Sequence, residues 1–179
     1  VMAASTLILG RLPGVARPTI GTFLPSQKSF TLLVDAGANV DSKPHHLQQF
    51  GIMGAILTEH LRGVKNPSVG LLNVGEEEGK GNEAAVEAWK LLKASPVRFI
   101  GNVEGRDILK GTVDVVVCDG FTGNIILKFA ESVPGFLKAK FSDIARQGFV
   151  NKLKIGLVRG NMRTMMKDWD YQEQGGVPL

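Results

Sequence analysis

Cysteine is almost absent from this sequence, since Cys118 is the only one in 179 residues. An internal disulfide needs two thiols and a cysteine-based zinc site needs several, so neither is available, and a reducing, cytoplasmic compartment is expected. Long apolar runs are also missing, because none approaches the roughly 18 to 20 residues that span a bilayer. We therefore expect no membrane-spanning helix.

Low-complexity tracts and internal repeats are likewise absent. With 44% hydrophobic and 21% charged residues, the composition is that of an ordinary globular protein and not of a disordered chain. The length of 179 residues favours one domain, 1–179, with one substantial core. The chain opens on Val1 inside an apparent helix and stops at Leu179, where an apolar segment is starting, so we expect a piece of a longer protein.

Short apolar runs rich in β-branched residues alternate with longer segments of helical period. This pattern is typical of an α/β fold with a mostly parallel sheet covered by helices. Strands are expected at Thr19–Leu24, Phe30–Asp35, Ser68–Val74, Val97–Ile100 and Val113–Cys118. Helices are expected from Pro44 to about Leu61, from Asn82 to about Lys93, and from about Thr122 to Val133, where Pro134 should interrupt the last one.

Residues 134–167 differ from the rest of the chain, and we expect a basic, amphipathic helical extension there. Within Lys128–Lys167 nine basic residues stand against two acidic ones, although the whole chain has a net charge of only +4. Apolar residues recur among these charges at roughly helical spacing, from Phe136 to Met162. Such a segment is typical of helices at a membrane surface or at an acidic partner, and a dimer interface is the alternative.

Four loops rich in Gly, Asn and Asp follow the predicted strands. They are Asp35–Asn39, Asn73–Asn82, Gly101–Asp107 and Asp119–Asn124. Because right-handed crossovers place the carboxyl ends of parallel strands along one edge, the four loops should share one crevice. A tight strand-to-helix connection would explain any one loop, but four loops at one edge indicate a ligand site.

The composition of these loops favours phosphate as the ligand. Glycine lets backbone amides approach a ligand closely, and a helix N-terminus adds unpaired donors and a partial positive charge. Lys80 and Asn82 stand at the predicted start of one helix, and Thr122, Gly123 and Asn124 stand at the start of another. Both groups are candidate contacts for a phosphate or an oxyanion.

A Walker phosphate loop is not present. That motif needs four residues between its glycines and a Ser or Thr after its lysine, but Gly75 and Gly79 enclose three residues and Gly81 follows Lys80. A nucleoside triphosphatase is therefore disfavoured. The pI of about 9.3 raises a nucleic-acid-binding module as an alternative, but few aromatic residues are interleaved with the basic ones.

The sequence matches the dinucleotide-binding fingerprint more closely than it matches the Walker motif. Residues Gly79–Ala84 fit the pattern Gly-x-Gly-x-x-Ala, and Glu104 lies near the spacing of a ribose-binding acid. The three glutamates at 76–78 separate the strand from the first glycine and would repel a pyrophosphate placed there. An NAD-dependent dehydrogenase therefore stays open as an alternative class.

Cys118 and the histidines are the remaining candidates for covalent or metal chemistry. Cys118 ends an apolar run, and we interpret it as a buried strand residue and not as an acyl-thioester nucleophile. His45, His46 and His60 lack clustered partners, so we interpret them as packing or surface residues and not as metal ligands. The glutamates at 76–78 could hold a divalent ion, but pairing with lysine and arginine is favoured.

Five stretches of the sequence carry a resemblance to a known family. They are Leu33–Pro44, Gly70–Glu83, Phe99–Asp107, Val116–Asn124, and Asp170-Tyr171 followed by Gly175–Leu179. In this order they closely resemble the bacterial PlsX-type phosphate acyltransferases, over nearly the whole chain. The family's N-terminal part and its extreme C-terminus have no counterpart here, so the resemblance implies a partial chain.

The resemblance implies a fold related to phosphotransacetylase and to isocitrate and isopropylmalate dehydrogenases. It implies transfer of an acyl group from acyl carrier protein to inorganic phosphate, which makes acyl phosphate for phospholipid synthesis without a cofactor or a metal. It also implies a cytoplasmic homodimer that associates peripherally with the membrane. The expected partners are thus acyl carrier protein, inorganic phosphate and a membrane surface, and not nucleic acid.

The candidate site residues follow from the loops together with this resemblance. Lys80, Asn124 and Asp119 are the candidate catalytic residues. Lys80 would offset the charge of phosphate, Asn124 would stabilise the oxyanion, and Asp119 would orient either of them. The candidate substrate-binding residues are Asn39, Lys43, Gly79, Gly81, Asn82, Arg106, Thr122 and Gly123.

Three of these assignments have structural alternatives. Arg106 could pair with a glutamate in the run at 76–78 instead of contacting phosphate. Asn39 and Lys43 precede a predicted helix, where a polar residue often caps the first turn.

Overall fold

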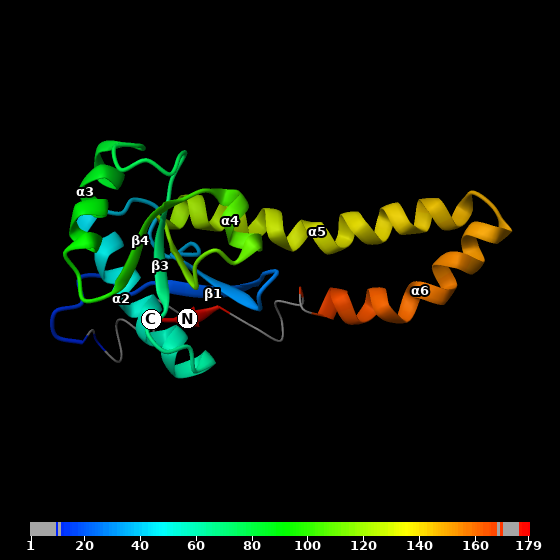
Figure 1. Ribbon diagram of the computed structural model, residues 1–179, viewed down its shortest axis with the longest axis horizontal. Helices are drawn as coiled ribbons and strands as arrows, with labels where there is room; N and C mark the ends of the chain where they lie inside the picture. Colours follow the sequence, from blue (N-terminus) through cyan, green and yellow to red (C-terminus); the bar gives the residue numbers. More distant parts are fainter. Residues whose placement is uncertain (1–9, 11, 168, 170–175) are drawn as a thin grey trace. The chain divides into compact units, whose positions relative to one another are not determined.

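The computed structural model describes residues 10, 12–167, 169 and 176–179. It contains a six-stranded sheet in the order β4-β3-β5-β2-β1-β6 (Figure 1). The strands are β1 (Ile20–Pro25), β2 (Phe30–Val34), β3 (Ser68–Leu72), β4 (Arg98–Val103), β5 (Val115–Val117) and β6 (Val177–Pro178). Strands β2, β5, β3 and β4 are parallel neighbours, whereas β1 is antiparallel to β2 and β6. The predicted mostly parallel sheet of an α/β fold is confirmed.

The central strands are mostly apolar, and residues that point to both faces of the sheet are buried. Val34, Val69 and Val115 are completely buried. Helix α2 (Pro44–Arg62) packs on β2, β3 and β5. The helix can lie close to the sheet because Gly54 has no side chain. A Cβ at this position would lie only 2.8 Å from the Cγ1 of Val115.

Four further helices follow α2 along the chain. They are α3 (Glu83–Lys93), α4 (Gly105–Lys110), α5 (Gly120–Arg146) and α6 (Phe149–Lys167). Helix α4 lies within what the sequence suggested was a loop, and β4 also runs on to Val103. A reciprocal cap explains the start of α4, since the backbone N–H of Glu104 donates to Asp107 Oδ2 over 2.9 Å.

The expectation that Pro134 interrupts the third helix is wrong. Helix α5 runs without a break from Gly120 to Arg146, with Pro134 inside it (Figure 1). Proline removes one backbone donor and strains one turn. The regular bonds on either side of that turn are retained, so a helix of 27 residues continues through it.

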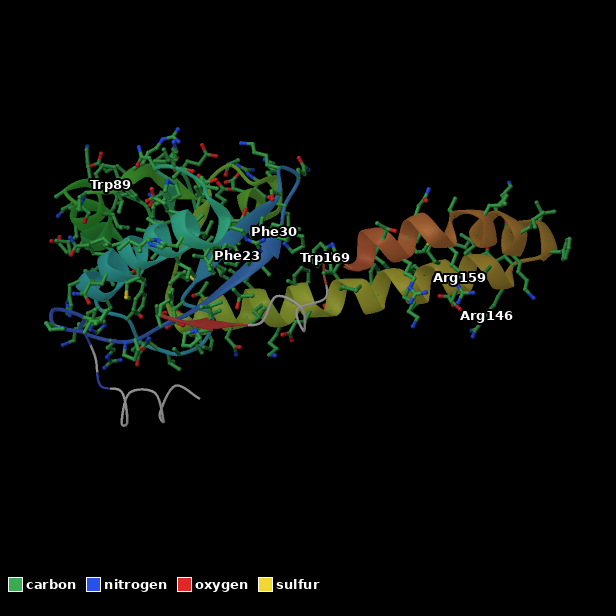
Figure 2. The ribbon with its side chains drawn as sticks, turned by 90° about the horizontal axis from the view of Figure 1, so that it is seen from below. Phe23, Phe30, Trp89, Arg146, Arg159 and Trp169 are labelled. Carbon is green, nitrogen blue, oxygen red and sulfur yellow. The ribbon has the colours of Figure 1, made fainter. Side chains whose placement is uncertain are left out.

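The chain divides into two compact units. The first, Val1–Ile125 with Gly176–Leu179, holds the sheet, helices α2 to α4 and the start of α5. The second, Ile126–Gly175, holds the rest of α5 and α6, which folds back beside it (Figures 1 and 2). The basic extension expected at 134–167 lies in this second unit, and the single domain expected over 1–179 stays a prediction.

Parts of the expected features fall outside the described residues. These are the apparent helix at Val1 and the Asp170-Tyr171 pair. In the part of the chain that the structure does describe, no helix is both long and apolar enough to cross a membrane.

Candidate active site at the carboxyl edge of the sheet

Three of the loops that the sequence singled out follow the parallel strands β2, β3 and β5, and the fourth segment, Gly101–Asp107, is the end of β4 with the start of α4. The structure places all four at one edge of the sheet. They form two contacting pairs. Gly120 at the start of α5 donates its N–H to the carbonyl of Asn39 over 2.7 Å, which joins the loops after β2 and β5. Asn102 Nδ2 donates to the carbonyl of Glu77 over 2.6 Å, which joins the β3 loop to β4.

A buried carboxylate organises the loop after β2. Asp35 is completely buried and accepts hydrogen bonds from the backbone N–H groups of Gly37, Ala38 and Asn39 over 2.8 to 3.0 Å. The amide of Asn39 donates to the same carboxylate and to the carbonyl of Pro18. Both side-chain donors of Asn39 therefore bond within the protein. The hydrogen bonds from Asn39 and the loop amides satisfy the buried carboxylate of Asp35.

The start of α5 presses against this loop, and only glycine allows that contact. A Cβ at Gly123 would overlap the carbonyl oxygen of Asp35, and a Cβ at Gly120 would lie 2.6 Å from the carbonyl oxygen of Asn39. Gly123, a candidate substrate contact, thus has a packing role that the sequence did not reveal.

Asp119 caps α5 and is paired with Thr122. Its Oδ1 accepts from the Thr122 N–H and its Oδ2 from the Thr122 hydroxyl, each over 2.8 Å. The structure therefore brings these two candidates together as a helix cap. The Asn124 side chain is exposed beside Gly37, and it has no hydrogen-bond partner within the part of the chain that the structure describes.

The loop between β3 and α3 is held by two asparagines that sequence reasoning did not select. Asn73 Nδ2 donates to the carbonyl of Lys80 over 2.8 Å, while Asn102 holds the carbonyl of Glu77. Gly81 has a φ of 98° and packs on Asn73, so its glycine is required by the turn, whereas Gly79 has open space around its Cα.

Lys80 and Asn82 play different parts in this loop. Asn82 caps α3, because its Oδ1 accepts from the Ala85 N–H over 2.9 Å. The Lys80 side chain is exposed, and among the described residues its ammonium has no ion-pair partner. Lys80 is therefore available to a ligand.

The structure shows Arg106 in ion pairs with glutamates and Lys43 at the start of a helix. The guanidinium of Arg106 pairs with Glu104 over 3.1 Å and with Glu76 over 3.5 Å. Lys43 stands just before α2, where its backbone N–H donates to Nδ1 of His46 over 3.1 Å, and its side chain is exposed.

Burial shifts two titrating groups near this edge. The pKa of the Cys118 thiol is raised well above its ordinary value, mainly by burial and then by the nearby carboxylates Asp119 and Asp35. Its Sγ donates to the Asp35 carbonyl over 3.5 Å, so the prediction of a buried Cys118 is confirmed. The pKa of His46 is lowered, first by burial and then by the charges of His45, Arg17 and Lys43.

The arrangement suits an oxyanion. Two helices, α3 and α5, begin at this edge, so the positive ends of their dipoles lie there. The N–H groups of Gly120, Thr122 and Ala85 already donate within the protein. Lys80 adds a full positive charge and Asn124 adds an amide. Among the described residues, no group of three or more His, Cys, Asp or Glu side chains is arranged to hold a metal ion.

Comparison with known proteins identifies relatives of this chain. The family model of the fatty acid synthesis protein matches residues 1–179. A phosphate acyltransferase from Halothermothrix orenii is 47% identical over 100% of this chain and 54% of its own length. One from Syntrophotalea carbinolica is 50% identical over 99% of this chain and 51% of its own. The chain thus spans about half the length of these curated relatives.

Solved structures share the fold at low sequence identity. The EutD phosphotransacetylase from Staphylococcus aureus is 19% identical with a TM-score of 0.58, over 73% of this chain and 46% of its own. A phosphotransacetylase from Streptococcus pyogenes is 17% identical with a TM-score of 0.53, over 68% of this chain and 43% of its own. The fold expected from the sequence is confirmed.

Proposed function

This chain belongs to the fatty acid synthesis protein family, and from that premise we propose that the protein transfers an acyl group from acyl carrier protein to inorganic phosphate. The names of its curated relatives, phosphate acyltransferase, carry this proposal. The product, acyl phosphate, would enter phospholipid synthesis. A dehydrogenase and a nucleic-acid-binding module are not favoured by these relatives.

The carboxyl edge of the sheet supports phosphate as the acceptor. Phosphate would lie at the starts of α3 and α5, where helix dipoles favour an anion, and it would accept hydrogen bonds from those N–H groups that the caps do not use. The ammonium of Lys80 would offset part of its negative charge. Asp35 and Asp119 would act indirectly, because their oxygens already hold the loop and the cap in place.

The reaction requires one bond to form and one to break. A phosphate oxygen attacks the thioester carbonyl carbon, and the carbonyl oxygen takes up negative charge in a tetrahedral intermediate. The Asn124 amide would donate to that oxygen. The carbon–sulfur bond then breaks, the carrier's thiolate leaves and takes a proton from solvent, and acyl phosphate remains. The buried thiol of Cys118 has no part in this sequence.

Substitution of the two exposed polar candidates tests this function. We expect Lys80→Ala and Asn124→Ala, in the full-length protein, to lower turnover at saturating phosphate by about a hundredfold or more, as loss of an oxyanion donor typically does. Lys65→Ala is the matched control, because Lys65 is exposed and follows α2 at the opposite edge. Acyl phosphate release from the carrier thioester is the measurement. Normal turnover in both variants would contradict the proposed site.

The second unit supports an association with membranes. Phe149 and Leu157 on α6 are 81% and 78% exposed, among basic residues that would attract anionic lipid. We include peripheral membrane binding in the proposal, with acyl carrier protein, an acidic partner, approaching the same basic surface.

A groove within the second unit supports self-association. It has a volume of about 1020 Å³ between α5 and α6, and Phe141, Ile155 and Met162 line it together with basic residues. An apolar groove of this kind suits the packing of a second copy, so the proposed active form is a homodimer.

A further inference from the structure

A second pocket opens at the other edge of the sheet, away from the loops described above. It has a volume of about 400 Å³ and lies within the first unit, between the β1–β2 turn, the end of α2 and the segment that joins α4 to β5. This volume falls in the range of small-molecule sites. The amino ends of the parallel strands meet here, so the pocket shares no residue with the proposed phosphate crevice.

An arginine held by two aromatic rings marks the pocket. The Arg62 guanidinium carbon lies 4.4 Å from the ring centre of Phe23 and 4.3 Å from that of Phe30. Figure 2 shows both rings close together on the β1–β2 hairpin. These contacts orient the guanidinium. Within the described part of the chain Arg62 has no carboxylate partner, so its N–H donors remain available.

A residue in the wall of this pocket carries a buried hydroxyl that has no hydrogen-bond partner among the described residues. Thr58 lines the pocket one helical turn before Arg62, and its side chain is only 3% exposed. Its Oγ1 makes no hydrogen bond to any described residue. Buried polar groups are nearly always satisfied, and rotation of the Thr58 side chain would bring this hydroxyl to a ligand in the pocket.

The charges around the pocket favour an anion. Lys28 and Arg62 line it, against a single carboxylate, Asp114. Asp114 already accepts from the N–H and the hydroxyl of Ser68 through its Oδ2, over 2.7 and 2.6 Å. The carboxyl end of α2 carries only about half a negative charge, which the two cations outweigh.

We propose that this pocket binds a small organic oxyanion, with an apolar body and one phosphate or carboxylate group. The oxyanion would pair with Arg62 and Lys28, the Thr58 hydroxyl would turn to donate to it, and the apolar body would lie against Phe30 and Leu61. A planar guanidinium held on its faces is suited to such a group.

Titration of the full-length protein with phenyl phosphate tests this site. We expect calorimetric binding, with amide NMR shifts at Ser29 and Gly111, and weaker binding of benzoate, which carries less charge. Benzyl alcohol, which carries none, should not bind. Arg62→Gln should weaken phenyl phosphate binding about tenfold.

Two further variants separate a ligand role from a structural one. Thr58→Val removes the orphan hydroxyl at nearly constant volume, so it should leave the melting temperature unchanged or higher while weakening phenyl phosphate binding about threefold. Lys93→Gln is the matched control, because Lys93 also lies over an aromatic ring, 4.5 Å from the centre of Trp89, outside the pocket. Wild-type affinity in Arg62→Gln, or NMR shifts confined to the opposite loops, would overturn the proposal.

Discussion

At the scale of single residues, the candidate site contains two kinds of side chain. Some form hydrogen bonds that hold the loops and helix starts in place, and others are exposed and available to a ligand. Asn39, Asn82 and Asp119 bond within the protein, whereas Lys80 and Asn124 are exposed without partners among the described residues. A sequence shows the residue types but not this division, because the bonding partners come from the fold.

The packing role of Gly123 predicts a large effect of one methyl group. We expect Gly123→Ala to lower the free energy of unfolding by about 1–3 kcal/mol, because its Cβ would overlap the Asp35 carbonyl oxygen in a close-packed contact. Gly135→Ala in the same helix is the matched control. A Cβ at Gly135 would meet nothing within 4 Å, so this variant should raise the free energy of unfolding by up to about 1 kcal/mol. Equal effects in urea denaturation would contradict this interpretation.

The buried thiol of Cys118 predicts chemical inertness. Because burial raises its pKa, the folded protein keeps the unreactive thiol form, and iodoacetamide at pH 8 should label Cys118 only after unfolding. Cys118→Ala should retain most acyl transfer. An acyl adduct on Cys118, trapped and identified by mass spectrometry, would show the opposite.

At the scale of elements, caps decide where several helices begin. Asn82 and Asp119 start α3 and α5 through side-chain oxygens, and Glu104 with Asp107 starts α4. Helix α4 was missed because six residues give too short a periodic pattern. The sequence predicts that α5 ends at Val133, because Pro134 usually interrupts a helix, but the helical period continues on both sides of this proline.

The cap of α2 predicts a pH dependence of stability. Neutral His46 accepts from the Lys43 N–H, and the pKa of His46 is lowered in the folded state, so its contribution is complete above the ordinary histidine pKa of about 6.5. That contribution is lost as the pH falls through the lowered folded pKa. We expect the free energy of unfolding to decrease from pH 7 towards pH 5 in the wild type.

Two histidine variants check this dependence. His46→Gln should flatten the decrease, because the titrating group is gone. The exposed His60 lies near the end of the same helix, and His60→Gln should keep the wild-type slope. An unchanged slope in His46→Gln would assign the dependence to other groups.

At the scale of the whole molecule, the two units are suited to different tasks. The first carries the loops of the proposed phosphate site, and the second carries exposed apolar residues among basic ones. The proposed acceptor is soluble and the proposed product carries an acyl chain, so a surface for lipid on the same chain is chemically useful.

Substitutions in the second unit should separate the loss of membrane binding from the loss of the dimer. Changing Phe149 and Leu157 together to Glu should abolish binding to liposomes that contain anionic lipid while the dimer persists, because these side chains are almost fully exposed. Phe141→Glu places a charge in the groove and should dissociate the dimer, with liposome binding retained by the monomer. Liposome flotation and sedimentation velocity are the measurements.

A charge-matched control accompanies these variants. Asn161 and Thr164 are exposed on α6, and changing both to Glu adds the same charge without removing an apolar group. Liposome binding should then be reduced only at low salt. Dissociation of the dimer by the Phe149 and Leu157 changes would instead identify that surface as the subunit interface.

The amino-acid sequence by itself determined the α/β class, the order of the central strands' loops along the chain and their convergence on one edge. These features follow from hydrophobic periodicity and from the handedness of crossovers, which act locally and in chain order. Tertiary structure alone decided that Asp35 organises a loop, that Gly123 must lack a side chain, and that Thr58 is left without a partner. Each of these depends on groups far apart in sequence, such as Asp35 and Gly123, whose distance is set only when helices pack on the sheet.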